Sequence, residues 1–222
     1  MIKLSKIAKP DVLTENGEAW TQTLLAKIAS NLEPTLTEKT RYRHPDIKAA
    51  LVAETHGKCA YCESKLQHIH HGDVEHIFPK SRAPEKTFEW YNLTFSCEIC
   101  NQNKSDKDPH LQHIIDPYHI DPALHLQFLG SFVFPLGTAL GKNTEVILDL
   151  NRVRLCEARK EHLERVMGIF ETILREELPL VTRKSIYDNL LAQEGSSSAA
   201  YSAMTVSALT TLREKLPQEF FD

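Results

Sequence analysis

The chain has 222 residues, 25% of them charged, and a formal net charge of −4. This length supports a sizeable core, and the composition is that of an ordinary soluble globular protein, which excludes a fibrous or disordered chain. We find no run of about eighteen apolar residues and no signal-peptide core. We therefore expect a cytoplasmic protein without a membrane segment, in a compartment where thiols stay reduced.

Two helices are predicted ahead of the first cysteine. Apolar positions recur at helical spacing over residues 16–32, and Pro34 closes this amphipathic segment. A second helix is predicted over residues 44–57, with Pro45 in its first turn and Gly57 as its cap. This helix leads the chain into a cysteine motif.

Two Cys-x-x-Cys pairs, Cys59/Cys62 and Cys97/Cys100, can fill the four corners of a tetrahedron. Four thiolates leave no open coordination position, so the sequence predicts a structural zinc site. A redox dithiol would need only one pair. The fifth cysteine, Cys156, has no partner at ligand spacing and is predicted to lie in the core.

Four residues within or beside this zinc loop have the chemistry of phosphodiester hydrolysis. His76 titrates near neutrality and is the predicted general base. Glu75 offers a carboxylate oxygen and Asn101 an amide oxygen to a catalytic Mg²⁺ or Mn²⁺. Asn92 lies between the base and the second cysteine pair, and we expect it to hold the histidine's segment through main-chain hydrogen bonds.

The neighbouring acid and base set a geometric condition. Consecutive side chains on a regular strand point to opposite faces, yet Glu75 and His76 must both act on one phosphate. We therefore expect the strand to end or twist before Pro79. Asp73 shares a face with Glu75 and could assist it from two residues upstream, although we expect it to be a solvent-exposed strand acid.

Other polar residues near the motif receive no assigned chemistry. His68, His70 and His71 fit no common zinc set, so we give them no role. Any one of the nearby basic residues is explained at least as well by a solvated surface as by phosphate contact. Because the chain is acidic overall, binding to a polyanion must be local or shared with a partner. The basic residues are Lys80, Arg82, Lys86, Lys104 and Lys107.

A short hairpin is predicted after the motif. The stretches 126–134 and 145–148 have the composition of short strands, separated by Gly137 and Gly141. We expect this hairpin to pack on the zinc module.

Helices are predicted for the rest of the chain. A long helix covers residues 153–178, and another runs from Pro179 to about Glu194. Residues 195–198 form a loop, and a last helix covers roughly residues 199–216. The apolar stripes of these helices are explained either by core packing or by a surface for another protein.

The predicted fold class is α+β and mainly helical. We expect an N-terminal helical region over residues 1–55 and a zinc-bound nuclease module over residues 56–115. The third region, residues 116–222, is expected to contain the β-hairpin and the C-terminal helices.

The motif strings DVEHIFP, WYNL and CEICNQNKSD resemble those of HNH endonucleases, over roughly residues 56–108. The resemblance implies a ββα-metal fold, with the acid and base on the first strand and the last asparagine on the helix, binding the metal. Glu75, His76, Asn92 and Asn101 take the family's positions. Many members have aspartate before the base, so Glu75 adds one methylene between backbone and metal.

The opening MIKL, the GKCAYCE turn, the Asp116-Pro117 turn and the LDLN string resemble a narrower group, the HNH subunit of Septu and related retron anti-phage systems. This resemblance implies an ABC- or SMC-type ATPase partner that supplies contacts to double-stranded DNA. The expected function is metal-dependent hydrolysis of DNA that leaves a 5′-phosphate and a 3′-hydroxyl. Two alternatives stay open: a zinc-bound scaffold that binds nucleic acid or a partner without cutting, and an RNA-cleaving nuclease.

Overall fold

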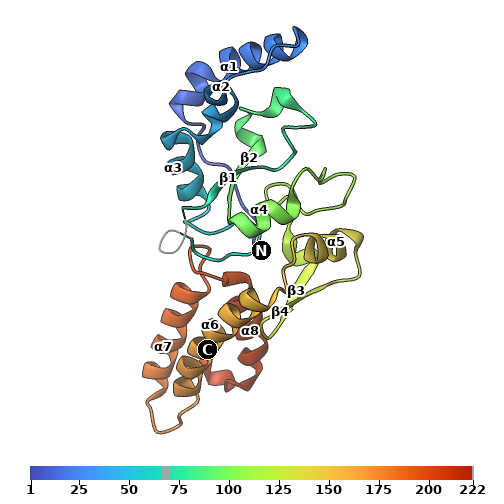
Figure 1. Cartoon of the computed structure of the whole chain (residues 1–222). Coiled ribbons are helices and arrows are strands. Elements are labelled where there is room, and N and C mark those ends of the chain that lie inside the picture. Colours follow the sequence, from blue (N-terminus) through green and yellow to red (C-terminus); the bar gives the residue numbers. More distant parts are fainter. Residues whose placement is uncertain (67–70, 222) are drawn as a thin grey trace.

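The computed structural model describes residues 1–66 and 71–221. His68 and His70 lie outside these residues, and His71 is exposed. Within the described residues, N-terminal helices occupy one end of the molecule, a module with a two-stranded sheet lies in the middle, and long helices occupy the other end (Figure 1). No helix in this part of the chain is long and apolar enough to cross a membrane.

The chain opens with helices that lead into the cysteine motif. They are α1 (Asp11–Ala29), α2 (Leu36–Thr40) and α3 (Pro45–Glu54). α1 begins five residues before the predicted start, directly after Pro10, and ends three residues before the predicted end. α3 ends three residues before the predicted Gly57 cap: Thr55 is its C-cap and His56 takes the left-handed conformation, with a φ of +54°. Gly57 follows, and its N–H closes the turn on the carbonyl of Val52 at 2.8 Å.

The central module has the order strand, strand, helix. β1 (Asp73–His76) pairs antiparallel with β2 (Leu93–Ser96), and α4 (Glu98–Lys104) follows. Gly72 enters β1 with a φ of +63°, and a Cβ there would lie 2.1 Å from the Phe95 ring. Only glycine therefore allows this ring to pack under the start of the strand.

Short 3₁₀ turns link the longer elements. They are η1 (Arg41–Arg43), η2 (Pro84–Lys86), η3 (Trp90–Asn92), η4 (Pro122–Leu124), η5 (Arg213–Lys215) and η6 (Gln218–Phe220).

The predicted hairpin is partly correct. β3 (Leu126–Leu129) and β4 (Phe132–Pro135) form an antiparallel pair, so the whole hairpin lies within ten residues. The prediction of a strand over residues 145–148 is wrong, because most of that stretch lies in α5 (Ala139–Ile147). A short apolar run suits a strand and a buried helical turn equally well. Here Thr138 caps the helix by accepting a hydrogen bond from an N–H in the first turn.

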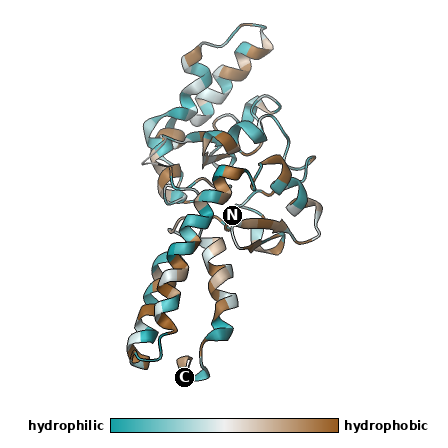
Figure 2. Ribbon diagram, turned by 60° about the horizontal axis from the view of Figure 1, so that its bottom comes forward, coloured by the Kyte–Doolittle hydropathy of each residue, from teal (hydrophilic) through white to brown (hydrophobic). Residues whose placement is uncertain are grey.

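Three helices complete the chain: α6 (Val153–Ile173), α7 (Leu180–Glu194) and α8 (Ser202–Leu212). α6 ends five residues before the predicted end, and residues 195–198 form the predicted loop. Figure 2 shows apolar and polar stretches alternating along these helices, as expected for helices with one buried face. The α+β, mainly helical fold class is confirmed.

Two apolar clusters hold the molecule together. The larger joins Leu13 of α1, Phe95 of β2, Leu126 of β3 and Met204 of α8, so it draws on all three predicted regions. The smaller lies among the C-terminal helices around Phe170. The three-region division stays a prediction.

Candidate metal centre and active site

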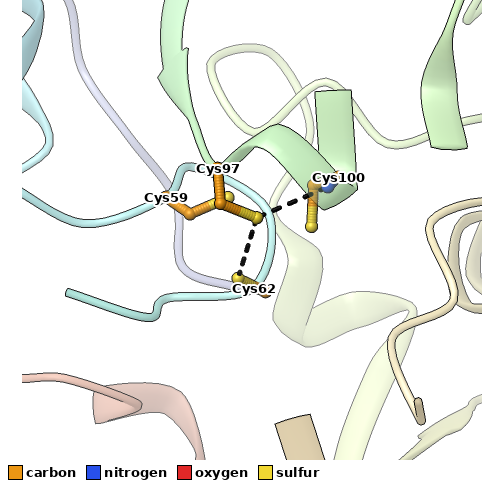
Figure 3. A group of neighbouring side chains, drawn as sticks. All are labelled: Cys59, Cys62, Cys97 and Cys100. Atoms are coloured by element: carbon orange, nitrogen blue, oxygen red, sulfur yellow. Dashed lines mark hydrogen bonds between the residues drawn. The ribbon is translucent and has the colours of Figure 1, made fainter. Parts of the chain in front are cut away.

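Four cysteines form a compact buried cluster. The sulfur atoms of Cys59, Cys62, Cys97 and Cys100 all lie within 4.8 Å of one another, and those of Cys62 and Cys97 are 3.9 Å apart. Figure 3 shows their side chains converging from two segments of the chain. A tetrahedral zinc site with zinc–sulfur bonds of about 2.3 Å has sulfur–sulfur edges of about 3.8 Å. The cluster therefore suits a structural zinc ion. Cys156 is buried elsewhere, as predicted.

Local backbone bonds build both halves of this cluster. The first pair lies on a tight turn after α3, where Ala60 N–H donates to the carbonyl of Phe95 at 2.9 Å. The second pair begins α4, where the sulfur of Cys97 accepts a hydrogen bond from the N–H of Cys100 at 3.4 Å. Both halves are thus joined to the end of β2.

An arginine lies against the cysteine sulfurs. Arg152 precedes α6, and its guanidinium nitrogens lie 3.8 Å from the sulfurs of Cys97 and Cys100. Burial alone lowers the pKa of Arg152, but the neighbouring thiols outweigh it and raise the pKa above its ordinary value. Four thiolates around Zn²⁺ carry a net negative charge, which this guanidinium offsets. Arg152 lies 52 residues beyond Cys100, so the spacing of the cysteine motif gave no sign of it.

His76 ends β1 and is 5% exposed. Its Nε2 lies 3.0 Å from the backbone carbonyl of Thr87. A carbonyl can only accept, so Nε2 carries the hydrogen and Nδ1 keeps a lone pair. The Tyr42 ring packs edge-on against the imidazole, with centroids 4.6 Å apart. Burial and then the charge of Lys80 lower the pKa of His76 to about 3, so the ring is neutral at pH 7.

Glu75 is 5% exposed and has a buried cationic partner. Lys104 Nζ lies 2.8 Å from Glu75 Oε1 and donates a hydrogen bond to the backbone carbonyl of His76 at 2.8 Å. Burial raises the pKa of Glu75, and the charge of Lys104 opposes that rise. Lys104 is 1% exposed, so it is an internal tie between α4 and β1, unlike the solvated surface lysine considered for this position.

Asn101 is half-buried on α4 and bonded to a carboxylate. Its Nδ2 donates to Asp73 Oδ2 at 3.0 Å. Because a carboxylate only accepts, the amide nitrogen must point toward Asp73 and the amide oxygen away from it. Asp73 is itself half-buried and bonded, which corrects the expectation of a solvent-exposed acid.

Asn92 is buried and bonds the main chain beyond β1. Its Oδ1 accepts from Phe78 N–H at 2.7 Å, and its Nδ2 donates to the carbonyls of Phe78 and Lys86 at 3.0 and 3.2 Å. Asn92 therefore clamps the segment that follows His76 and does not line the cavity described next.

Glu75, His76 and Asn101 line one cavity of about 740 Å³, together with Lys80 and Asp106. β1 ends at His76, as the geometric condition required. The structure thus brings the acid, the base and the amide to one space. The ion pair of Lys104 with Glu75 was not predicted; the spacing of three residues between Lys104 and Asn101 could have indicated a shared helix face.

The two strands, the helix and the cysteine cluster form one ββα module. Residues 59–107 match the family model described as HNH endonuclease. The chain is 34% identical over 110 residues to Septu protein PtuB of Bacillus thuringiensis, covering 49% of this chain and 42% of that protein. It is 24% identical over 259 aligned residues to Septu protein PtuB of Bacillus mycoides (strain KBAB4), covering 92% of this chain and 88% of that protein. The predicted resemblance to an HNH nuclease of this type is confirmed.

Proposed function

We propose that this chain is a metal-dependent endonuclease that hydrolyses phosphodiester bonds in DNA and leaves a 5′-phosphate and a 3′-hydroxyl. The observation that carries the proposal is the shared cavity of Glu75, His76 and Asn101. A base can activate the attacking water, and carboxylate and amide oxygens can bind the metal ion that assists the reaction.

In this proposal, His76 takes the proton of the attacking water at Nδ1, because its Nε2 hydrogen is engaged by Thr87. An anionic phosphate in the cavity opposes the depression of the histidine's pKa. Glu75 and Asn101 would hold Mg²⁺ or Mn²⁺ through their oxygens. When bound, such a cation neutralises charge on the phosphate and stabilises the leaving oxygen.

Positioning falls to residues that do not touch the substrate. Lys104 fixes the carboxylate of Glu75 and the backbone of His76 together. Asn92 closes the following loop, and the zinc-bound cysteines hold the start of α4, the helix that carries Asn101 and Lys104. The structural zinc thereby sets the position of the catalytic groups.

We further propose that the chain is the nuclease component of an anti-phage defence system in the cytoplasm and acts with an ABC- or SMC-type ATPase. Similarity to Septu protein PtuB over 92% of the chain supports this assignment. The net charge of −4 also supports a partner that supplies DNA contacts, since phosphate neutralisation dominates non-specific DNA binding.

The test is an incubation of the zinc-loaded protein with supercoiled plasmid and Mg²⁺, alone and with the proposed ATPase partner. Glu75→Gln removes the charged metal ligand but keeps its shape. Glu85→Gln makes the same change at an exposed residue of η2. We expect cutting by the parent and Glu85→Gln, and strong loss with Glu75→Gln or EDTA.

Cutting that persists in EDTA would contradict the metal-dependent mechanism. Cleavage of RNA but not plasmid would change the substrate and keep the catalytic assignment. Binding without cleavage of either nucleic acid, with and without the ATPase, would favour the scaffold.

A further inference from the structure

The cavity around His76 has an apolar side that phosphodiester hydrolysis does not require. Its residues come from α1, from the segment before α2 and from η2, and α1 packs directly against η2. We call these residues the apolar wall: Leu24, Ile28, Pro34 and Pro84. Ile28 is 44% exposed, so it presents apolar surface to the cavity without being part of the core.

Duplex nucleic acid offers little that matches such a wall. Its outer surface is phosphate and sugar, and its base faces are stacked inside. A base that has left the stack exposes two apolar faces. The cavity volume of about 740 Å³ lies within the range of roughly 300–1,000 Å³ for pockets that enclose small molecules. One nucleotide fits such a space.

A cation in the same cavity suits the phosphate of that nucleotide. Lys39 and Lys80 both line it; Lys39 is already paired with Glu33, which lines it too, so we assign the phosphate to Lys80. Lys80 Nζ lies 4.9 Å from the centroid of the Tyr42 ring, the ring that packs edge-on against His76. A cation is thus held beside the proposed base, and the apolar wall is left for the rest of the nucleotide.

We propose that the site binds its substrate with one nucleotide unstacked beside the scissile phosphate, its base lying against the apolar wall. This inference rests on the proposed nuclease function and specifies its substrate. The preferred sites are those where a nucleotide is unpaired, such as a bulge, because the cost of unstacking is already removed there.

The experiment compares two labelled duplexes of one sequence, fully paired or with a single-nucleotide bulge. Ile28→Asn removes the apolar side chain without adding charge. Leu36→Asn makes the matched change on α2, where Leu36 is 78% exposed and does not line the cavity. We expect the parent and Leu36→Asn to cut the bulged duplex at least about tenfold faster than the fully paired duplex. Ile28→Asn should lose most of that preference.

A binding measurement separates this inference from the nuclease proposal. The bulged nucleotide is replaced by 2-aminopurine, whose emission reports its stacking, and the duplex is mixed with His76→Ala. The inference is supported, even if no duplex is cut, if binding of His76→Ala changes the emission of 2-aminopurine. The double variant His76→Ala/Ile28→Asn should then change the emission less. Equal cutting of both duplexes by the parent and Ile28→Asn would overturn it and leave the nuclease standing. Absent binding or unchanged emission would also overturn it.

Discussion

Lys104 and Glu75 show how one buried ion pair organises the proposed active site. Lys104 is on α4, Glu75 is on β1, and the lysine also binds the backbone of His76. Removing one partner of a buried pair leaves an uncompensated charge, which costs roughly 3–5 kcal/mol. Breaking this pair should therefore lower both the free energy of unfolding and the affinity of the site for its metal ion.

Lys104→Met tests the positioning role at the level of the single residue. Without the ammonium, the carboxylate of Glu75 loses the group that fixes it, so we expect Mn²⁺ affinity to fall about tenfold or more. Titration of Mn²⁺ by electron paramagnetic resonance, on folded zinc-loaded protein, measures this directly. Lys104→Arg keeps the charge and should retain part of the affinity. If Lys104→Met binds Mn²⁺ as tightly as the parent does, Lys104 contributes to the fold and does not position Glu75 for the metal ion.

Asn92→Ala removes three hydrogen bonds to partly buried main-chain groups of the loop after β1. We expect the free energy of unfolding to fall by about 2 kcal/mol or more, because those groups lose their partner. Urea denaturation of the zinc-loaded protein measures the loss. Tyr91→Ala, at the exposed neighbouring residue, is the control and should change little. If Asn92→Ala and Tyr91→Ala are equally stable, the hydrogen bonds of Asn92 do not hold this loop.

At the scale of elements, α4 connects the cysteine cluster to the proposed catalytic strand. The helix begins at the second cysteine pair and ends at Lys104, one side of the ion pair with Glu75. A change that loosens the start of α4 is therefore expected to displace Lys104 at its end.

Cys100→Ser should release zinc and unfold the central module, since a structural zinc ion contributes on the order of 10 kcal/mol to the folding of such sites. Zinc content and circular dichroism measure the two effects. Cys156→Ser changes a cysteine that is also buried but lies outside the cluster, and it should keep one zinc per chain. Full zinc occupancy in Cys100→Ser would contradict a four-cysteine site.

The packing of α6, α7 and α8 contains a buried histidine, from which we expect a pH-dependent contribution to their stability. His162 Nε2 lies 3.0 Å from Thr205 Oγ1, and Arg165 and Glu194 lie beside the ring. Burial, and then the charge of Arg165, lower the pKa of His162 below its ordinary value of about 6.5. The unfolded chain therefore takes up a proton before the folded chain does.

Stability should accordingly fall as the pH drops below about 6.5, by at most about 1.4 kcal/mol per pH unit from this group. His162→Gln keeps a neutral polar side chain and should remove this part of the dependence. Urea denaturation between pH 7.5 and 5.5 compares the two proteins. Identical slopes would show that His162 is not responsible.

On the scale of the whole molecule, buried polar ties join the cysteine turn to the C-terminal helices. Glu63, next to the first cysteine pair, accepts from Ser202 Oγ at 2.9 Å and pairs with Lys58 at 3.2 Å. Arg152 makes a second tie, from the start of α6 to the cysteine sulfurs. The zinc module and the C-terminal helices therefore form a connected structure.

The features predicted correctly from the sequence are those that depend on residues close together in the chain. The cysteine pairs, and the end of β1 at His76, follow from local spacing. Arg152, Tyr42 and the apolar wall come from distant segments, and only tertiary packing brings them to the site. Local pattern also failed over residues 145–148, where a partly exposed helical turn has the composition of a strand.

The most direct test of the central claim is the cleavage rate of His76→Ala relative to the parent, with Mg²⁺ and plasmid DNA. Both proteins must be zinc-loaded and must bind Mn²⁺ equally. His119→Ala, at a histidine whose side chain is 71% exposed, serves as the control. If His76 is the general base, its loss lowers the rate by about 10²- to 10⁴-fold while the control cuts normally. A His76→Ala protein that cuts as fast as the parent would contradict the mechanism.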